Sequence, residues 1–210
     1  MPDSLINLSC GGFSEQLSSK APVPGGGGAA ALIGSLAAAL GTMATNLTIG
    51  KKKFLPFEED HRRIIAEADV LRIRLLALMD EDAAAIEPLS QVYSLDKNSP
   101  GYTEKLTAAT LDACRVPFEM MECCCKLTGL LEELREKCSV LLLSDVGCAA
   151  LAARCALESA SLNVFVNTRM IPENEEATAM SKKADSMLQE YIPRAQAVSD
   201  SVMNYLRRQK

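Results

Sequence analysis

The chain has 210 residues, of which 48% are hydrophobic and only 4% aromatic, and its formal net charge is −5. A chain of this length and apolar content can bury a sizeable core, which excludes an intrinsically disordered protein. Acidic and basic residues are interspersed, without the basic face and interleaved aromatic residues of a nucleic-acid-binding protein. We therefore expect one domain over residues 1–210 and no nucleic-acid partner.

Eight cysteines and one histidine bear on disulfide and metal sites. Cys123, Cys124 and Cys125 are adjacent, and no cysteine pair has the spacing of a zinc site. His61 lies in a charged run and is expected on a solvated helix face. The sequence starts without the basic segment of a signal peptide, which favours a cytoplasmic protein with reduced, mostly buried thiols over a disulfide scaffold. We expect no bound metal.

A short helix marked by Phe13 and Leu17 precedes a proline- and glycine-rich break, after which a long helix is expected over residues 29–49. This segment carries no charge, so its length also fits a membrane span. Its many small residues instead favour a buried helix that packs closely on another helix, with no membrane insertion. The small residues recur at steps of four and three: Ala30, Gly34, Ala37, Gly41 and Ala44.

The next expected helix covers residues 57–95 and carries an apolar seam in which Asp82 takes one place. The apolar members of the seam are Ile64, Ala68, Leu71, Leu75, Leu78, Ala85 and Leu89. Because burying a bare charge is costly, such a carboxylate must be paired, hydrogen-bonded or protonated. It is either a structural link between two helices or a functional group. Asp80 and Glu81 lie off the seam and are expected in solvent.

The second half of the chain also reads as helical, with Pro117 and Pro193 expected to kink or break two of the helices. A helix over residues 140–167 carries a second small-residue stripe with polar ends, namely Asp145, Ala149, Ala152, Ala156, Ala160, Asn163 and Asn167. No strand-like alternation occurs. The predicted fold is therefore all-α, a single-domain helical bundle with long, partly kinked helices.

Two short runs suggest binding of an anion. Glycines at positions 25–28 precede a helix, where free backbone N–H groups suit an anion, although a tight turn would also explain them. Lysines at positions 51–53 follow the same helix and are either a solvated helix end or a source of positive charge. Neither run has the spacing of a phosphate-binding loop.

Together these segments resemble the formiminotransferase-cyclodeaminase family, specifically its cyclodeaminase domain and the stand-alone bacterial methenyltetrahydrofolate cyclohydrolases. The segments that carry the resemblance are, in chain order, Ala21-Pro22-Val23-Pro24-Gly25-Gly26-Gly27-Gly28, Asn46-Leu47-Thr48-Ile49-Gly50-Lys51-Lys52-Lys53, Leu78-Met79-Asp80-Glu81-Asp82-Ala83, Val116-Pro117, Leu143-Ser144-Asp145-Val146-Gly147 and Asn163-Val164-Phe165-Val166-Asn167. Family members usually have a Gly-Asn pair shortly before the Ser-Asp, where this chain has the apolar stretch 138–143.

The resemblance implies a reduced folate as substrate, with or without a polyglutamate tail, and no cofactor beyond tetrahydrofolate itself. Cyclodeamination releases ammonia from formiminotetrahydrofolate, and the cyclohydrolase reaction opens methenyltetrahydrofolate to a formyl group. Both reactions need a positioned acid and base. We place cyclodeaminase first, cyclohydrolase as the alternative, and a catalytically inactive folate-binding or assembly protein as a third hypothesis.

Residue types suggest the roles of individual groups. Asp82, Asp145 and Lys51 are the candidate acid–base residues, and they must converge from distant helices, across a subunit boundary if necessary. Substrate-binding candidates are Pro24, Gly25, Gly26, Gly27, Asn46, Lys52 and Asn163. Lysines at the helix end would hold an acidic folate tail, so affinity should increase with glutamate number at low salt. A homodimer is expected, with the small-residue stripes as its contacts.

Overall fold

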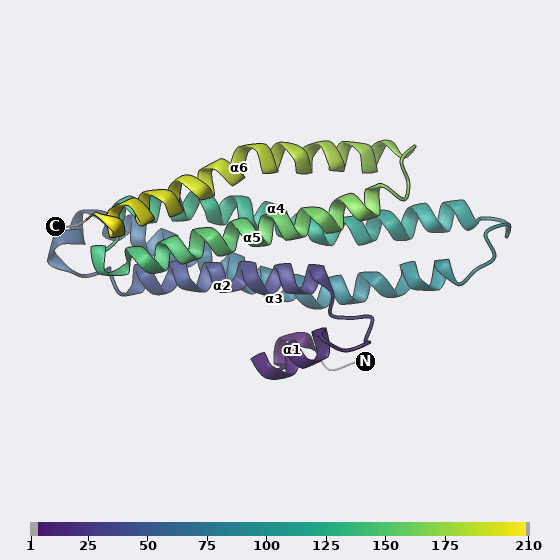
Figure 1. Cartoon of the computed structure of the whole chain (residues 1–210), viewed down its shortest axis with the longest axis horizontal. Helices are drawn as coiled ribbons and strands as arrows, with labels where there is room; N and C mark the ends of the chain where they lie inside the picture. The colour runs from purple at the N-terminus through teal and green to yellow at the C-terminus, as the bar shows by residue number, and fades with distance from the viewer. Residues whose placement is uncertain (1–3, 209–210) are drawn as a thin grey trace.

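The computed structural model describes residues 4–208, and every regular element in that range is a helix. The elements are, in chain order, η1 (Leu5–Asn7), α1 (Cys10–Leu17), α2 (Gly26–Asn46), η2 (Lys52–Phe57), α3 (Glu58–Tyr93), α4 (Tyr102–Lys137), η3 (Val140–Leu142), α5 (Leu143–Thr168) and α6 (Glu175–Arg207). Helices α2 to α5 run side by side along the long axis, α6 lies along α4 and α5, and α1 lies outside the bundle (Figure 1). The predicted all-α helical bundle is confirmed.

Helix α2 packs between α3 and α5 because one of its faces consists of small residues. A Cβ added at Gly34 would lie 3.2 Å from a methyl carbon of Leu75 and 3.4 Å from the Cβ of Ala156. One at Gly41 would lie 3.1 Å from Leu131. These close contacts are made within one chain. The prediction that the small-residue stripes form homodimer contacts is therefore wrong, since neighbouring helices of the same protomer already cover them.

Two segments, Gly26–Asn46 and Val140–Thr168, are long and apolar enough to cross a membrane by length and composition. A buried core helix meets the same criteria. In α2 the share of the apolar window that is buried within the chain is 56%, and helices lie against it on two sides. This is the packing that the small residues of the segment predict.

The expected exposure of His61 is wrong. The side chain is fully buried, and its Nε2 lies 2.8 Å from the carbonyl oxygen of Lys137, to which it donates at the end of α4. His61 precedes Ile64 by three residues and so continues the buried seam of α3, which outweighs the charged residues around it.

The cysteines are all free, but they divide into two groups. Five are buried, as expected for most of the thiols, namely Cys114, Cys123, Cys124, Cys125 and Cys138, whereas Cys10, Cys148 and Cys155 are exposed. Helix α4 continues through Pro117, so a break does not form there. Helix α6 bends about midway along its length, where Pro193 lies.

Candidate functional site

The N-terminal end of α2 is met by the side chain of Asp82, which comes from α3. The first N–H groups of a helix have no partner within it, and the N-cap of α2, Gly25, provides no side chain. The Gly28 N–H donates a hydrogen bond to the Asp82 carboxylate instead. A Cβ at Gly27 would lie only 2.3 Å from Asp82 Oδ1. Asp82 therefore caps α2 from a neighbouring helix, and Gly27 permits the approach.

The environment of Asp82 changes its acidity. Burial raises the pKa of this carboxyl to about 6, and the hydrogen bond from the Gly28 N–H opposes that increase. The side chain is partly buried rather than fully enclosed. A carboxyl with a pKa near 6 gains and loses a proton close to neutral pH, which suits general acid–base chemistry.

Two other candidates lie beside Asp82. A Cβ at Gly26 would lie 3.6 Å from Asn163 Nδ2, so the Asn163 amide on α5 faces the first turn of α2. This amide donates to the Ser159 carbonyl oxygen at 3.0 Å, which fixes its orientation. Pro24 is buried against Gly28. We call this group the glycine end; its members are Pro24, Gly25, Gly26, Gly27, Gly28, Asp82 and Asn163.

The remaining candidates lie at the opposite end of α2. Asn46 is the last residue of α2, and Asp145 lies in the first turn of α5. Thr48 Oγ1 accepts a hydrogen bond from the Ser139 N–H at 3.1 Å, which places the start of α5 beside the end of α2. Both lysines, at positions 51 and 52, are exposed. We call this group the lysine end; its members are Asn46, Lys51, Lys52 and Asp145.

The two ends are far apart within one protomer. Helix α2 has 21 residues, and at 1.5 Å per residue it is about 30 Å long. A lysine side chain spans a small part of that length, so Lys51 does not meet Asp82 in the same chain. Their convergence across a subunit boundary, and the binding of an acidic folate tail by the lysines, stay predictions.

Sequence reasoning missed two residues near the glycine end. Asp80 was expected in solvent, but its carboxylate accepts hydrogen bonds from the Leu5 N–H at 2.7 Å and from the Ser4 hydroxyl. Helical periodicity gives no sign of these contacts, because the partner lies 75 residues away. Gly28, the backbone donor to Asp82, follows directly after the candidate Gly27, and only the structure identifies it as the donor.

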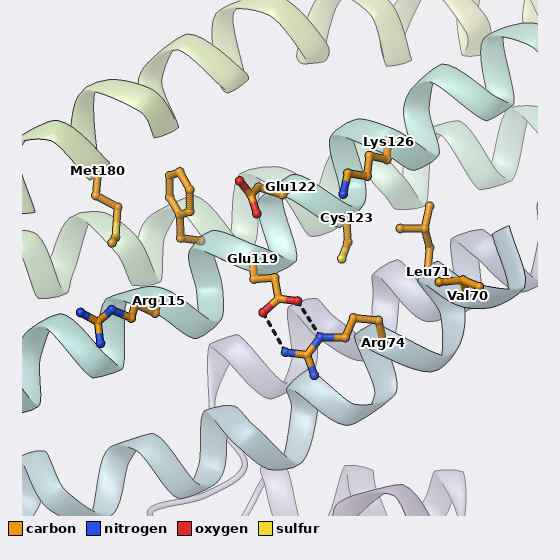
Figure 2. Close-up of a pocket in the computed structure, with 10 residues that line it drawn as sticks. Val70, Leu71, Arg74, Arg115, Glu119, Glu122, Cys123, Lys126 and Met180 are labelled. Carbon is orange, nitrogen blue, oxygen red and sulfur yellow. Dashed lines mark hydrogen bonds and ion pairs between the residues drawn. The ribbon is translucent and has the colours of Figure 1, made fainter. Parts of the chain in front are cut away.

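A separate cavity of about 380 Å³ lies between α3, α4 and α6 (Figure 2). Its lining includes Arg74, Arg115 and Lys126 but no residue of the glycine or lysine end. Arg74 is already paired with Glu119 at 2.6 Å and with Glu81 at 2.5 Å. Because the protein's own carboxylates compensate this guanidinium, the cavity is less suited to an anionic substrate than its positive side chains suggest.

No group of three or more His, Cys, Asp or Glu side chains within residues 4–208 is arranged to hold a metal ion.

Comparison with known proteins identifies the family of this chain. The family described as Formiminotransferase-cyclodeaminase matches residues 9–186. The methenyltetrahydrofolate cyclohydrolase of Methylorubrum extorquens is 36% identical over 85% of this chain and 88% of its own. The formimidoyltransferase-cyclodeaminase of Mus musculus is 29% identical over 95% of this chain, which corresponds to 38% of that longer protein. The crystal structure of formiminotetrahydrofolate cyclodeaminase from Thermotoga maritima superimposes with a TM-score of 0.82, at 25% identity, over 94% of this chain and 98% of the other.

The family match covers most of the chain, and the structural similarity points to the same family as the sequence similarity. The protein belongs to the formiminotransferase-cyclodeaminase family.

Proposed function

We propose that the protein is an enzyme that acts on a one-carbon unit of tetrahydrofolate, and that it hydrolyses methenyltetrahydrofolate to formyltetrahydrofolate. The observation that carries the proposal is Asp82, a partly buried carboxyl with a pKa raised to about 6 at a glycine-rich helix N-terminus. The 36% identity to a cyclohydrolase of similar length favours hydrolysis over deamination.

In this reaction water adds to the carbon that bridges two folate nitrogens, and one C–N bond then breaks. The Asp82 carboxylate takes one proton from the attacking water and later returns it to the nitrogen that leaves. The second proton of the water goes to solvent when the formyl C=O forms. N–H groups of Gly26 and Gly27 stabilise negative charge on the oxygen of the tetrahedral intermediate, and the amide of Asn163 orients the ring. These proton transfers need no cofactor beyond the folate.

The test is incubation of the purified protein with methenyltetrahydrofolate and, separately, with formiminotetrahydrofolate. We expect methenyltetrahydrofolate to lose its methenyl absorbance and formiminotetrahydrofolate to release no ammonia. Asp82→Asn should lower the rate roughly a hundredfold or more, since it removes the general base. Normal turnover by the Asp82→Asn variant would remove Asp82 from the mechanism, and no turnover of either folate by the wild type would favour an inactive binding protein.

Cyclodeamination is the second candidate, favoured by the close structural similarity to the Thermotoga maritima protein. Its chemistry requires the same type of group, because an anilino nitrogen attacks the formimino carbon and ammonia leaves after protonation. Ammonia release that keeps pace with formation of methenyl absorbance would establish this activity instead.

We further propose that the protein is a homodimer whose contact is the outer face of α2 and α5. This α2/α5 face carries exposed apolar side chains between 37% and 67% accessible, namely Leu36, Met43, Leu47, Leu151, Leu162 and Val166. A two-fold axis perpendicular to this face at the middle of α2 would reverse the direction of the partner's α2 and so place the glycine end of one protomer near the lysine end of its partner. The site would then include groups from both chains.

Sedimentation at micromolar concentration should therefore give a dimer. Leu36→Glu should shift it to monomer, because it introduces a charge into the centre of the α2/α5 face. Val70→Glu is the matched control, since Val70 is 67% exposed on α3 and lies outside that face. A monomeric wild type, or a dimeric Leu36→Glu variant, would contradict this arrangement.

A further inference from the structure

Asp80 and Asp82 lie two residues apart on α3, and each binds a backbone N–H of another segment. Asp82 accepts from Gly28 at the start of α2. Asp80 accepts from the Leu5 N–H at the start of η1 through one oxygen and from the Ser4 hydroxyl through the other. Hydrogen bonds to a carboxylate are stronger than those between neutral groups. One short stretch of α3 thus holds both the beginning of the described chain and the beginning of α2.

The segment between these two points, residues 4–24, is named here the N-terminal strap. Figure 1 shows its helix α1 outside the bundle, so a few specific contacts determine its position. Leu5 and Phe13 are its buried anchors, at 6% and 7% exposure. At the other end of the strap, Gln16 Nε2 donates to the Val23 carbonyl oxygen at 3.2 Å.

The strap ends directly at the glycine end. Pro24 follows Val23 and is buried, and a Cβ at Gly28 would lie 3.3 Å from the Pro24 Cβ. The same Cβ would lie 3.6 Å from Met79, the neighbour of Asp80. Gly28 is therefore held on one side by the strap and on the other by α3, and any movement of Pro24 changes the N–H that Asp82 binds.

We propose that Asp80 is a positioning residue, which holds the strap on α3 and thereby fixes the N-terminus of α2 against Asp82. Its consequence for catalysis rests on the proposed function, because it requires Asp82 to take part in the reaction. The consequence for structure does not. A reactive group displaced by about 1 Å loses a large part of its rate advantage, so a residue that touches no substrate still controls turnover.

The experiment compares Asp80→Ala, which removes both acceptors, with Glu81→Ala as the matched control. Glu81 is the adjacent acid, and its carboxylate pairs with Arg74 of the same helix. Hydrogen exchange of residues 5–28 and the NMR titration of the Asp82 carboxyl are measured in both variants and the wild type. If Asp80→Ala does not fold, Ser4→Ala replaces it, because that change removes only one of the two hydrogen bonds.

In Asp80→Ala, amide exchange at Gly28 should accelerate about tenfold or more, because the strap opens and frees the first turn of α2. Asp82 should titrate at lower pH as water reaches it, and the limb of the kcat–pH profile that reports Asp82 should move with it. Glu81→Ala should change neither quantity. Unchanged exchange and an unchanged Asp82 titration in the folded variant would overturn the proposal.

The outcome separates the two proposals. If the wild type turns over no folate but Asp80→Ala still shifts the exchange and the Asp82 titration, the positioning role stands and the proposed function fails. If the wild type is active and the kcat–pH profile of Asp80→Ala matches that of the wild type, the positioning role in catalysis is overturned and the proposed function stands.

Discussion

At the residue scale, Asp82 is subject to two opposing effects. The N-terminus of α2 favours a negative charge, through the Gly28 N–H and the helix dipole. Burial disfavours the same charge, and its effect is the larger one, since the pKa rises from 3.8 to about 6. A residue kept only for stability would gain nothing from this imbalance. The cost in stability is typical of a functional group.

The pH dependence of stability should reveal that cost. Between the ordinary pKa of 3.8 and the folded-state pKa of about 6, the folded protein binds more protons at Asp82 than the unfolded chain does. The free energy of unfolding therefore falls as pH rises through this range and stays lower above it. Asp82→Asn removes the charge but keeps an oxygen for the Gly28 N–H. The quantity to compare is the melting temperature of Asp82→Asn minus that of the wild type. This difference should be roughly 3–6 °C larger at about pH 7.5 than at about pH 4.5. An equal difference at both pH values would contradict the raised pKa.

Gly27 and Gly26 provide a matched pair at the same site. Gly27→Ala should destabilise the protein by about 1–3 kcal/mol, because its Cβ would lie 2.3 Å from Asp82 Oδ1 and must displace that carboxyl. Gly26→Ala meets only Asn163, at the ordinary contact distance of 3.6 Å, and should leave the stability nearly unchanged. Urea unfolding of both variants measures the difference. Equal stabilities would mean that the first turn of α2 adjusts without strain.

At the element scale, helical periodicity allowed most of the core to be predicted. The seam of α3 is buried from Ile64 to Leu89 except where Asp82 and Ala85 are only partly covered. The charged neighbours of His61 predict a solvent-facing residue, whereas its spacing of three residues from Ile64 predicts a place on the buried seam. For this residue the helical spacing predicts burial correctly, and the charge of the neighbouring residues does not.

The candidate site was harder to predict than the core. The sequence identifies candidate residues by type, but it does not show that they form two groups about 30 Å apart at opposite ends of α2. The contacts of Asp80 with the N-terminal strap, and the backbone partner of Asp82, depend on tertiary packing. No pattern within a single helix encodes them.

The small-residue face of α2 predicts a stability effect at the element scale. Gly34→Leu should destabilise the folded chain by about 3 kcal/mol, because even a Cβ there lies 3.2 Å from Leu75 and the rest of the side chain overfills the contact. Leu36→Ala, on the exposed face of the same helix, should have a small effect on the unfolding of a single protomer. Thermal unfolding compares the two. A stable Gly34→Leu variant with altered assembly would instead place the stripe at a subunit contact.

At the scale of the whole molecule, candidate groups gather at two distant ends of one helix. Helix η3 lies next to the lysine end, and its Val140 and Leu141 are 48% and 81% exposed. These apolar side chains occupy the stretch that differs from the usual family pattern. Exposed apolar residues beside polar candidates are typical of a surface that a partner covers. A second protomer placed on the α2/α5 face would bring its own glycine end to this region.

Complementation between inactive variants tests whether one site uses both ends. If Asp82 and Lys51 act together only across the subunit boundary, Asp82→Asn and Lys51→Ala should each be inactive as homodimers. After unfolding and refolding as an equimolar mixture, half of the dimers are mixed, and each mixed dimer has one site with both wild-type residues. Activity should return to about a quarter of the wild-type value, as two-fold symmetry requires. Co-refolding Asp82→Asn with Asn163→Ala is the control. Both residues lie at the glycine end of one chain, so each glycine end of a mixed dimer carries one of the two substitutions, and activity should not return. Recovery in the mixture of Asp82→Asn with Lys51→Ala, and not in the control mixture, supports a shared site. No recovery in a Lys51→Ala mixture shown to contain mixed dimers would contradict it.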